Sequence, residues 1–254
     1  MTIRDIKGEV MDLIPVRNVI VSVFDKTGLD TFIPALVKAS PDVRFLSTGG
    51  TYKALERILA NVQIPTSLLE VAEYTEFPEM EGGLVKTLHP KIHAGILGER
   101  GNPEHQRYLK QILNRGDYID MVVVNLYPFD EVVRKIRDGE IDTKTSKPYN
   151  FESARGNIDI GGPTMIRAAA KNFPGCAVVC NPNNYSDVLN TIKKNNGATS
   201  FNQRFELAEE VFSAMEKYDG AISAYWREQF GGLNCQEIRK LYKFSGGSED
   251  GSHS

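Results

Sequence analysis

The stretch from Arg17 to Ala39, RNVIVSVFDKTGLDTFIPALVKA, decides the fold class of this chain. Its β-branched run Arg17–Val23 predicts a buried strand, and Gly28 leads into a periodic apolar pattern over Leu29–Ala39 that predicts a helix. The same order recurs further along. Strands are predicted at Val43–Ser47, Met121–Val124 and Cys176–Cys180, and helices at Tyr52–Asn61, Asn102–Arg115, Asp130–Asp138 and Asn181–Lys194. This alternation predicts an α/β fold, with a mostly parallel central sheet and helices on both faces.

The last third of the chain is mostly helical in pattern. The helical stretch runs from Thr199 to Phe230, and Asp219-Gly220 is predicted to interrupt it. Its predicted core face consists of Phe205, Phe212, Met215, Ile222 and Tyr225. The whole chain divides into an N-terminal extension over 1–16, a main domain over 17–230 and a polar tail over 231–254, which is predicted to be disordered.

The amino-acid composition indicates which class of protein this chain belongs to. The 254 residues suffice for one sizeable domain, and 25% charged with 41% hydrophobic residues is typical of a soluble globular protein. A net charge of −3 gives no reason to expect nucleic acid as a partner, and no apolar run approaches the ~20 residues that span a membrane. Three cysteines, and an N-terminus without the pattern of a signal peptide, predict a cytoplasmic protein.

Two loops that follow predicted strands carry anion-binding groups. The first contains Ser22, Lys26 and Thr27, and the second is the hydroxyl- and glycine-rich STGGT of Ser47–Thr51. A cation, hydroxyls and backbone N–H groups together bind anions, although each loop alone is also compatible with a plain helix start. Because the carboxyl ends of parallel strands face one crevice, we expect both loops to hold a single phosphate monoester.

The segment Lys86–Pro90, KTLHP, is predicted to be a long shaped loop, and such loops are often functional. Lys86 is a candidate electrostatic stabiliser. His89 and His93 have the spacing of metal ligands on one helix face, but Pro90 lies between them and the neighbouring sequence offers no third ligand. We therefore predict structural histidines and no metal site.

Two more loops add polar groups. Asn125 and Tyr127 stand just past the carboxyl end of a predicted strand, where the tyrosine either contacts a planar ligand or packs into the core. The stretch Asn157–Asn172, NIDIGGPTMIRAAAKN, is typical of a loop that leads into a helix. Free N–H groups at that helix start, beside the Asp159 carboxylate, would stabilise an oxygen that gains negative charge, although Gly-Gly-Pro more often marks a plain helix start.

Taken together, these loops predict a phosphate site with two further lysines, Lys86 and Lys171, one tyrosine and one carboxylate. Such a set suits proton transfer and oxyanion stabilisation on a small, planar, phosphorylated substrate. It includes no Ser or Cys triad for nucleophilic catalysis.

Six strings resemble the inosine monophosphate (IMP) cyclohydrolase domain, which is the N-terminal half of the bifunctional purine-biosynthesis enzyme and has a methylglyoxal-synthase-like fold. They are SVFDKTG, STGGT, VKTLHPKIHAGIL, VVVNLYPF, NIDIGGPTMIRAAAKN and AEEVFSAMEKYDGAIS, and they follow the family's order between Arg17 and Phe230. The resemblance implies dehydrative ring closure of 5-formamidoimidazole-4-carboxamide ribotide (FAICAR) to IMP without a cofactor. It also implies a homodimer and, because the transformylase half does not follow, either a separate transformylase partner or an excised domain.

The resemblance further implies roles for individual residues. The catalytic residues would be Lys86, Tyr127, Asp159 and Lys171. Pairing of Lys171 with Asp159 requires the loop before the helix to fold back, since a straight helix separates them by ~12 Å. The substrate-binding residues would be Ser22, Lys26, Thr27, Ser47, Thr48, Gly49, Gly50, Thr51, Thr87, Asn125, Ile160, Gly161 and Gly162.

The chain also departs from this family. Phe24, Leu84 and Gly156 stand where the family usually has a serine, an arginine and an acidic or polar residue, and the polar loop Gly139–Asn150 is longer than typical. Two other functions remain open on the sequence. One is a methylglyoxal-synthase-type lyase, and the other is a non-catalytic, nucleotide-binding regulatory module of the same fold.

Overall fold

The computed structural model describes residues 5–81, 84–114, 116–143, 145–230 and 233–244. Its contacts divide the chain into two compact units. Unit 1 comprises the described residues of 1–127 and 159–215, and unit 2 comprises those of 128–158 and 216–254. Within the described ranges, none of the helices combines the length and apolar composition needed to cross a membrane.

Unit 1 is built on a five-stranded parallel sheet with the strand order β4-β3-β2-β5-β8. Its strands are β2 (Asn18–Val23), β3 (Arg44–Ser47), β4 (Ser67–Glu70), β5 (Met121–Asn125) and β8 (Ala177–Val179). Strands β2 and β5 lie in the interior of the sheet and are almost entirely apolar, as expected for parallel strands covered on both faces. The predicted parallel sheet is confirmed.

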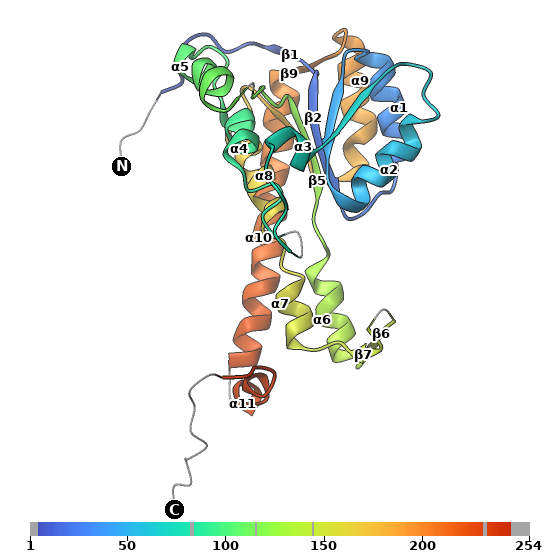
Figure 1. The fold of residues 1–254 in the computed structure, drawn as a ribbon, viewed down its shortest axis with the longest axis vertical. Helices are drawn as coiled ribbons and strands as arrows, with labels where there is room; N and C mark the ends of the chain where they lie inside the picture. Colours follow the sequence, from blue (N-terminus) through green and yellow to red (C-terminus); the bar gives the residue numbers. More distant parts are fainter. Residues whose placement is uncertain (1–4, 82–83, 115, 144, 231–232, 245–254) are drawn as a thin grey trace, which may run out of the picture. The chain divides into compact units, whose positions relative to one another are not determined.

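Helices cover both faces of this sheet. Figure 1 shows α1, α2 and α9 on one face and α4 and α8 on the other. Their bounds are α1 (Leu29–Ala39), α2 (Gly49–Leu59), α4 (Pro90–Leu97), α8 (Gly161–Lys171) and α9 (Tyr185–Lys194). The predicted α/β architecture is therefore confirmed, and the carboxyl edge of the sheet is where α1 and α2 begin.

Short elements complete unit 1, and β1 (Leu13–Pro15), α3 (Val71–Thr75) and β9 (Ala198–Ser200) are not predicted from the sequence pattern. The helix predicted over Asn102–Arg115 corresponds to α5 (Pro103–Arg107) followed by the π-helix η2 (Tyr108–Ile112). The 3₁₀ helix η3 (Pro182–Asn184) lies at the start of the helix predicted over Asn181–Lys194. Strand β1 pairs antiparallel with β9, and the side chain of Ile14 is buried there. The end of the predicted N-terminal extension is thus part of the packed unit, while 1–4 lie outside the described residues.

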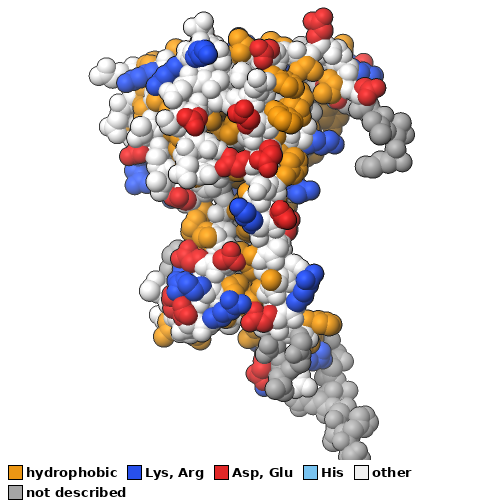
Figure 2. Space-filling model, turned by 180° about the vertical axis from the view of Figure 1, so that it is seen from behind, with side chains coloured by type: hydrophobic (Ala, Val, Ile, Leu, Met, Phe, Trp, Pro, Cys, Tyr) orange, Lys and Arg blue, Asp and Glu red, His pale blue; other side chains and the backbone are white. Residues whose placement is uncertain are grey.

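The helix α10 (Phe201–Phe230) corrects two predictions. It continues through Asp219-Gly220 without interruption, because one glycine costs only ~1 kcal/mol in a helix whose neighbouring turns are intact. Met215 and Tyr225 are buried as predicted, but Phe205 and Phe212 are 57% and 47% exposed. Figure 2 shows such hydrophobic side chains at the surface among charged ones. The buried stripe on the first part of α10 instead contains Arg204, Leu207, Ala208, Val211 and Met215.

Unit 2 contains α6 (Phe129–Arg137), β6 (Ile141–Asp142), β7 (Lys147–Pro148), α7 (Phe151–Gly156), the end of α10 and α11 (Leu233–Arg239). The rings of Phe129, Phe151, Tyr225 and Trp226 pack together as its aromatic core. The predicted polar loop over 139–150 contains the antiparallel pair β6–β7. Helix α11 lies inside the predicted tail, whose residues 245–254 are outside the described ranges.

Arg204 is fully buried, so this residue, and not Phe205 or Phe212, faces the core from α10. Its guanidinium donates hydrogen bonds to the carbonyl oxygens of Met11, Asp12, Phe173, Pro174 and Thr199 at 2.8–3.2 Å, and to the Thr199 hydroxyl at 3.4 Å. Burial lowers the pKa of Arg204 to about 10, which still leaves it charged at neutral pH. The side chain of Arg204 thus connects the N-terminal segment, the segment that follows α8, and β9.

Replacing Arg204 by lysine should lower the free energy of unfolding by roughly 3 kcal/mol, because an ammonium has three donors and leaves buried carbonyls unpaired. Urea unfolding followed by far-ultraviolet circular dichroism measures this. The matched control is Arg227→Lys at an exposed position of the same helix, with an expected change within about 0.5 kcal/mol. Equal unfolding curves for the two variants would contradict the role assigned to Arg204.

Candidate functional site

The start of α2 presents a set of backbone donors. Helix α2 begins at Gly49, directly after β3, and the first N–H that bonds back is that of Tyr52, to the carbonyl of Thr48. By helix geometry, the N–H groups of the preceding turn therefore point out beyond the helix start. Gly50 is exposed, and a Cβ built on it would meet nothing within 4 Å, so an anion can approach this turn.

The KTLHP loop links the starts of two helices. The ammonium of Lys86 lies 3.8 Å from the position that a Cβ on Gly49 would occupy, at the start of α2. The hydroxyl oxygen of Thr87, the next residue, lies 2.6 Å from the corresponding position on Gly161, at the start of α8. Neighbouring side chains of one loop therefore contact both helix starts, which brings the Ser47–Thr51 loop and the loop before α8 together.

Asp159 lies at the start of α8. Its Oδ1 accepts a hydrogen bond of 3.0 Å from the N–H of Gly162, and a Cβ on Gly162 would overlap its Oδ2. Partial burial raises the pKa of Asp159, while the N–H groups of Gly161 and Gly162 oppose that shift. A carboxylate with a raised pKa is a stronger proton acceptor, so this position suits a general base.

Asn125 and Tyr127 reach the loop between β2 and α1. The Asn125 amide accepts from the N–H of Asp25 at 2.9 Å and donates to the carbonyl of Asp25 at 2.8 Å. The ring of Tyr127 stands edge-to-face against Phe24, with centroids 4.3 Å apart. The structure thus brings both residues to the first predicted anion loop, and Phe24, a departure from the family, packs on a candidate catalytic ring.

Within that first loop, the polar groups already have partners. Lys26 donates to the carbonyls of Val23 and Phe24 at 3.3 Å, while the Thr27 hydroxyl donates to Asp25 at 2.7 Å. The hydrogen bonds from Thr27 hold the pKa of Asp25 below its ordinary value. Lys26 and Thr27 are exposed, so both side chains remain accessible to a ligand.

Two of the predicted hydroxyl donors are used inside the sheet. Ser47 is fully buried and donates to the carbonyl of Val21 at 2.7 Å, and Thr51 donates to the carbonyl of Val23 at 3.0 Å. In this conformation their hydroxyl hydrogens are not available to a phosphate, contrary to the expectation from the STGGT string. The side chain of Thr48 makes no capping hydrogen bond and stands at the start of α2.

Lys171 is not brought to this site. It ends α8 and is exposed, roughly 15 Å along the helix axis from Gly161. The loop before α8 does not fold back toward it, because Asp159 accepts the N–H of Gly162 and thereby caps the opposite helix end. The expected pairing of Lys171 with Asp159 is therefore corrected.

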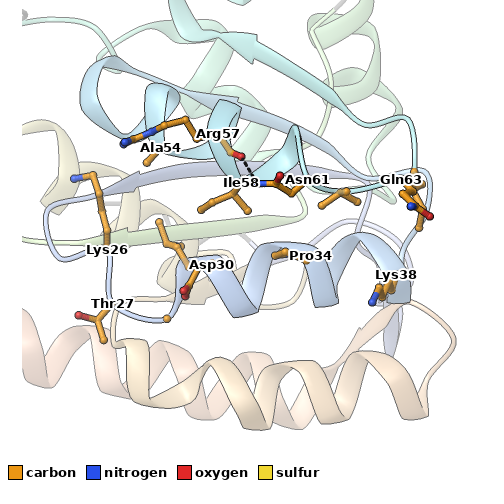
Figure 3. Close-up of a pocket in the computed structure, with 14 residues that line it drawn as sticks. Lys26, Thr27, Asp30, Pro34, Lys38, Ala54, Arg57, Ile58, Asn61 and Gln63 are labelled. Carbon is orange, nitrogen blue, oxygen red and sulfur yellow. Dashed lines mark hydrogen bonds between the residues drawn. The ribbon is translucent and has the colours of Figure 1, made fainter.

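A groove that sequence reasoning did not find starts at the first anion loop. A cavity of about 970 Å³ lies between α1 and α2. Figure 3 shows Lys26 and Thr27 at one end of it and Lys38 and Gln63 at the other, with Pro34 and Ile58 between them. No motif signals this groove, because its lining residues come from α1, α2 and the loops at their ends, which are separate segments of the sequence.

The two histidines of the KTLHP region organise the loop. His89 is the N-cap of α4, and its Nδ1 accepts the N–H of Lys91 at 3.1 Å. The ring of His93 hydrogen-bonds to the backbone of Thr87, and burial lowers its pKa. The predicted structural role is confirmed for His89. Among the described residues, His, Cys, Asp and Glu form no group of three that could hold a metal ion.

Acid should destabilise this loop through His89. Burial and then the charge of Lys91 lower the pKa of His89 below its ordinary 6.5, so its stabilising contribution is present above that pH and is lost as the pH falls. In His89→Asn the side chain still caps α4 but does not titrate, so the unfolding free energy of this variant should fall less than that of the unaltered protein between about pH 7.5 and 5.5. Urea unfolding at several pH values measures this, and identical pH dependence in both proteins would contradict it.

The chain matches the sequence models of two protein families. The sequence model of a family described as MGS-like domain matches residues 28–164. A second one, described as AICARFT/IMPCHase bienzyme, matches residues 169–247. The first match includes the loops at Ser47–Thr51 and Lys86–Pro90 and ends inside α8, so it spans most of the site described above.

Two curated relatives are each called bifunctional purine biosynthesis protein PurH. The protein from Rhodospirillum rubrum is 46% identical over 220 residues, which cover 86% of this chain and 37% of the relative. The protein from Clostridium beijerinckii is 46% identical over 210 residues, which cover 82% of this chain and 37% of the relative. This chain thus spans little more than a third of the length of these relatives.

A solved structure, the crystal structure of ForH, is similar in fold. It matches with a TM-score of 0.63 and 27% sequence identity, and the match covers 82% of this chain and 96% of that chain.

Proposed function

Because the chain belongs to the MGS-like domain family and is homologous to the cyclohydrolase part of PurH proteins, we propose that it is an IMP cyclohydrolase. The proposed reaction closes the ring of FAICAR to give IMP in purine biosynthesis. The carboxamide nitrogen forms a bond to the formyl carbon, and the formyl oxygen leaves as water with one proton from each of the two nitrogens. From the same homology we propose a cytoplasmic homodimer supplied by a separate transformylase.

One observation carries the proposal, namely that adjacent residues Lys86 and Thr87 contact the starts of α2 and α8. A nucleotide places its phosphate and its base at two ends of a ribose. A binding site for it therefore needs an anion cradle and a reactive centre that are close but separate. The two helix starts, joined by one loop, have that arrangement.

In the proposed complex the start of α2 holds the 5′-phosphate. The N–H groups of Gly49, Gly50 and Thr51 point toward it, and the dipole of α2 favours its charge. Lys26 and the hydroxyl of Thr48 stand at the same edge. Additional support comes from Ser22, Thr27 and Ser47, of which Ser47 acts by holding β3 against β2.

The start of α8 supplies the chemistry. Asp159 removes the proton from the carboxamide nitrogen as it attacks, and the N–H of Ile160 faces the formyl oxygen, since those of Gly161 and Gly162 bond to Asp159. We place the formyl oxygen within reach of the Lys86 ammonium, which lies at the start of α2 and stabilises the developing alkoxide from there. Asn125 and Tyr127 orient the carboxamide, because attack requires its C–N rotation to be restricted.

Purified protein should convert FAICAR to IMP, with a rise in ultraviolet absorbance above the uncatalysed rate. Asp159→Asn keeps an oxygen that accepts the N–H of Gly162 but removes the base, so kcat should fall by about 10²–10⁴ with little change in KM. Product formation at the uncatalysed rate by the unaltered protein would overturn the proposal. Turnover of dihydroxyacetone phosphate would then indicate a lyase, and calorimetric IMP binding without turnover a regulatory module.

A second test uses two glycines of the same stretch. In Gly162→Ala the new Cβ would overlap Asp159 Oδ2 and approach Leu126 Cδ2 to 2.8 Å, so the carboxylate must move. We expect kcat to fall roughly 10²-fold, the typical effect of a 1 Å displacement of a reacting group. The control is Gly156→Ala, where a Cβ would meet nothing within 4 Å and turnover should stay within about twofold. Equal activities of the two variants would exclude the assigned position of Asp159.

A further inference from the structure

We propose that Glu79 is a positioning residue that holds the Lys86 ammonium at the start of α2. This inference rests on the proposed function, in which Lys86 acts on the reacting oxygen. Glu79 Oε2 lies 2.6 Å from Lys86 Nζ, and the exposed fraction of the side chain is 32% for Glu79 and 24% for Lys86.

Electrostatics explains why Lys86 needs this partner. The ammonium lies next to Gly49, where α2 begins and its dipole places positive charge. A cation at that position is repelled by the helix dipole. Without a counter-charge, the four-carbon side chain of Lys86 would turn away from the helix start. The Glu79 carboxylate offsets the repulsion and leaves Lys86 beside the donors that would receive the substrate.

The local fold holds Glu79 in place. Helix α3 ends at Thr75, and Glu76 follows in the left-handed conformation, with φ 58°, which redirects the chain. The segment after it lines a cavity of about 320 Å³ together with the KTLHP loop, and both Glu79 and Lys86 face this cavity. Phe77 packs near His89 on its wall, with ring centroids 5.8 Å apart.

The other charged and titratable groups around Lys86 do not replace Glu79. Besides the pair itself, His89 is the titratable residue among those that line the cavity, and burial lowers its pKa, so it is neutral at pH 7 and above. Asp159 lies beyond Thr87 at the start of α8. Glu76 pairs instead with Lys91, at 3.9 Å. Glu79 is therefore the carboxylate that determines where the Lys86 ammonium lies.

A double-mutant cycle tests whether Glu79 acts through Lys86. Glu79→Gln should lower kcat about tenfold and leave KM within about twofold, because ammonium position matters in the transition state. Lys86→Met should lower kcat by roughly 10²–10³. If Glu79 only positions Lys86, the double variant is no slower than Lys86→Met. Multiplied losses in the double variant, as expected for an independent structural role, would overturn the proposal.

A second measurement does not depend on turnover. Competitive acetylation followed by mass spectrometry reports how readily each lysine reacts, and Lys86 should react several-fold faster in Glu79→Gln than in the unaltered protein, relative to exposed Lys53. Glu81→Gln, an exposed carboxylate of the same segment, is the matched control and should change nothing. An unchanged Lys86 rate would overturn the positioning role. If FAICAR is not turned over, the cyclohydrolase function fails, and this labelling result alone decides the role of Glu79.

Discussion

The contact between Thr87 and the bare backbone of Gly161 is the constraint on which the site depends. The hydroxyl of Thr87 occupies the space where a side chain at 161 would lie, so the KTLHP loop can pack directly on the start of α8. The preceding residue, Lys86, is then carried to the start of α2. A parallel sheet places helix starts along one edge, but it does not by itself join them. Here a single loop does so, anchored by His89 as the cap of α4 and by the hydrogen bond from His93.

Positively and negatively charged groups lie close together at the starts of α2 and α8. Two positive helix ends and the Lys86 ammonium lie near the carboxylates of Glu79 and Asp159, which offset their positive charge. Their surroundings differ. Glu79 faces an ammonium at 2.6 Å, whereas Asp159 accepts backbone N–H groups in a partly buried position that raises its pKa. One carboxylate therefore acts on a neighbouring side chain, and the other is suited to accept a proton.

Individual elements show which structural features the sequence patterns predict and which they do not. The β-branched run of β2 and the apolar stripe of α1 are local features, and both elements have nearly the bounds that the sequence predicts. The predicted core face of α10 is wrong. It includes Phe205 because phenylalanine is apolar, but the buried residue is Arg204. Its burial depends on five carbonyl oxygens, four of which belong to segments 30 or more residues away in the sequence and so to no local pattern. The hydroxyl of Ser47 is a similar case, since the pairing of β3 with β2 places it against Val21.

The sequence by itself determined the α/β class, the parallel strands and the polar loops at their carboxyl ends, because strand and helix periodicity and glycine-rich turns are encoded within a few neighbouring residues. Only the tertiary structure decided which of those polar groups meet. It placed Lys86 and Thr87 between two helix starts, paired Lys86 with Glu79, directed the Ser47 and Thr51 hydroxyls into the sheet and left Lys171 at the far end of α8. These outcomes depend on packing between segments that are far apart in the chain. The sequence of one segment alone does not determine the free energy of such contacts.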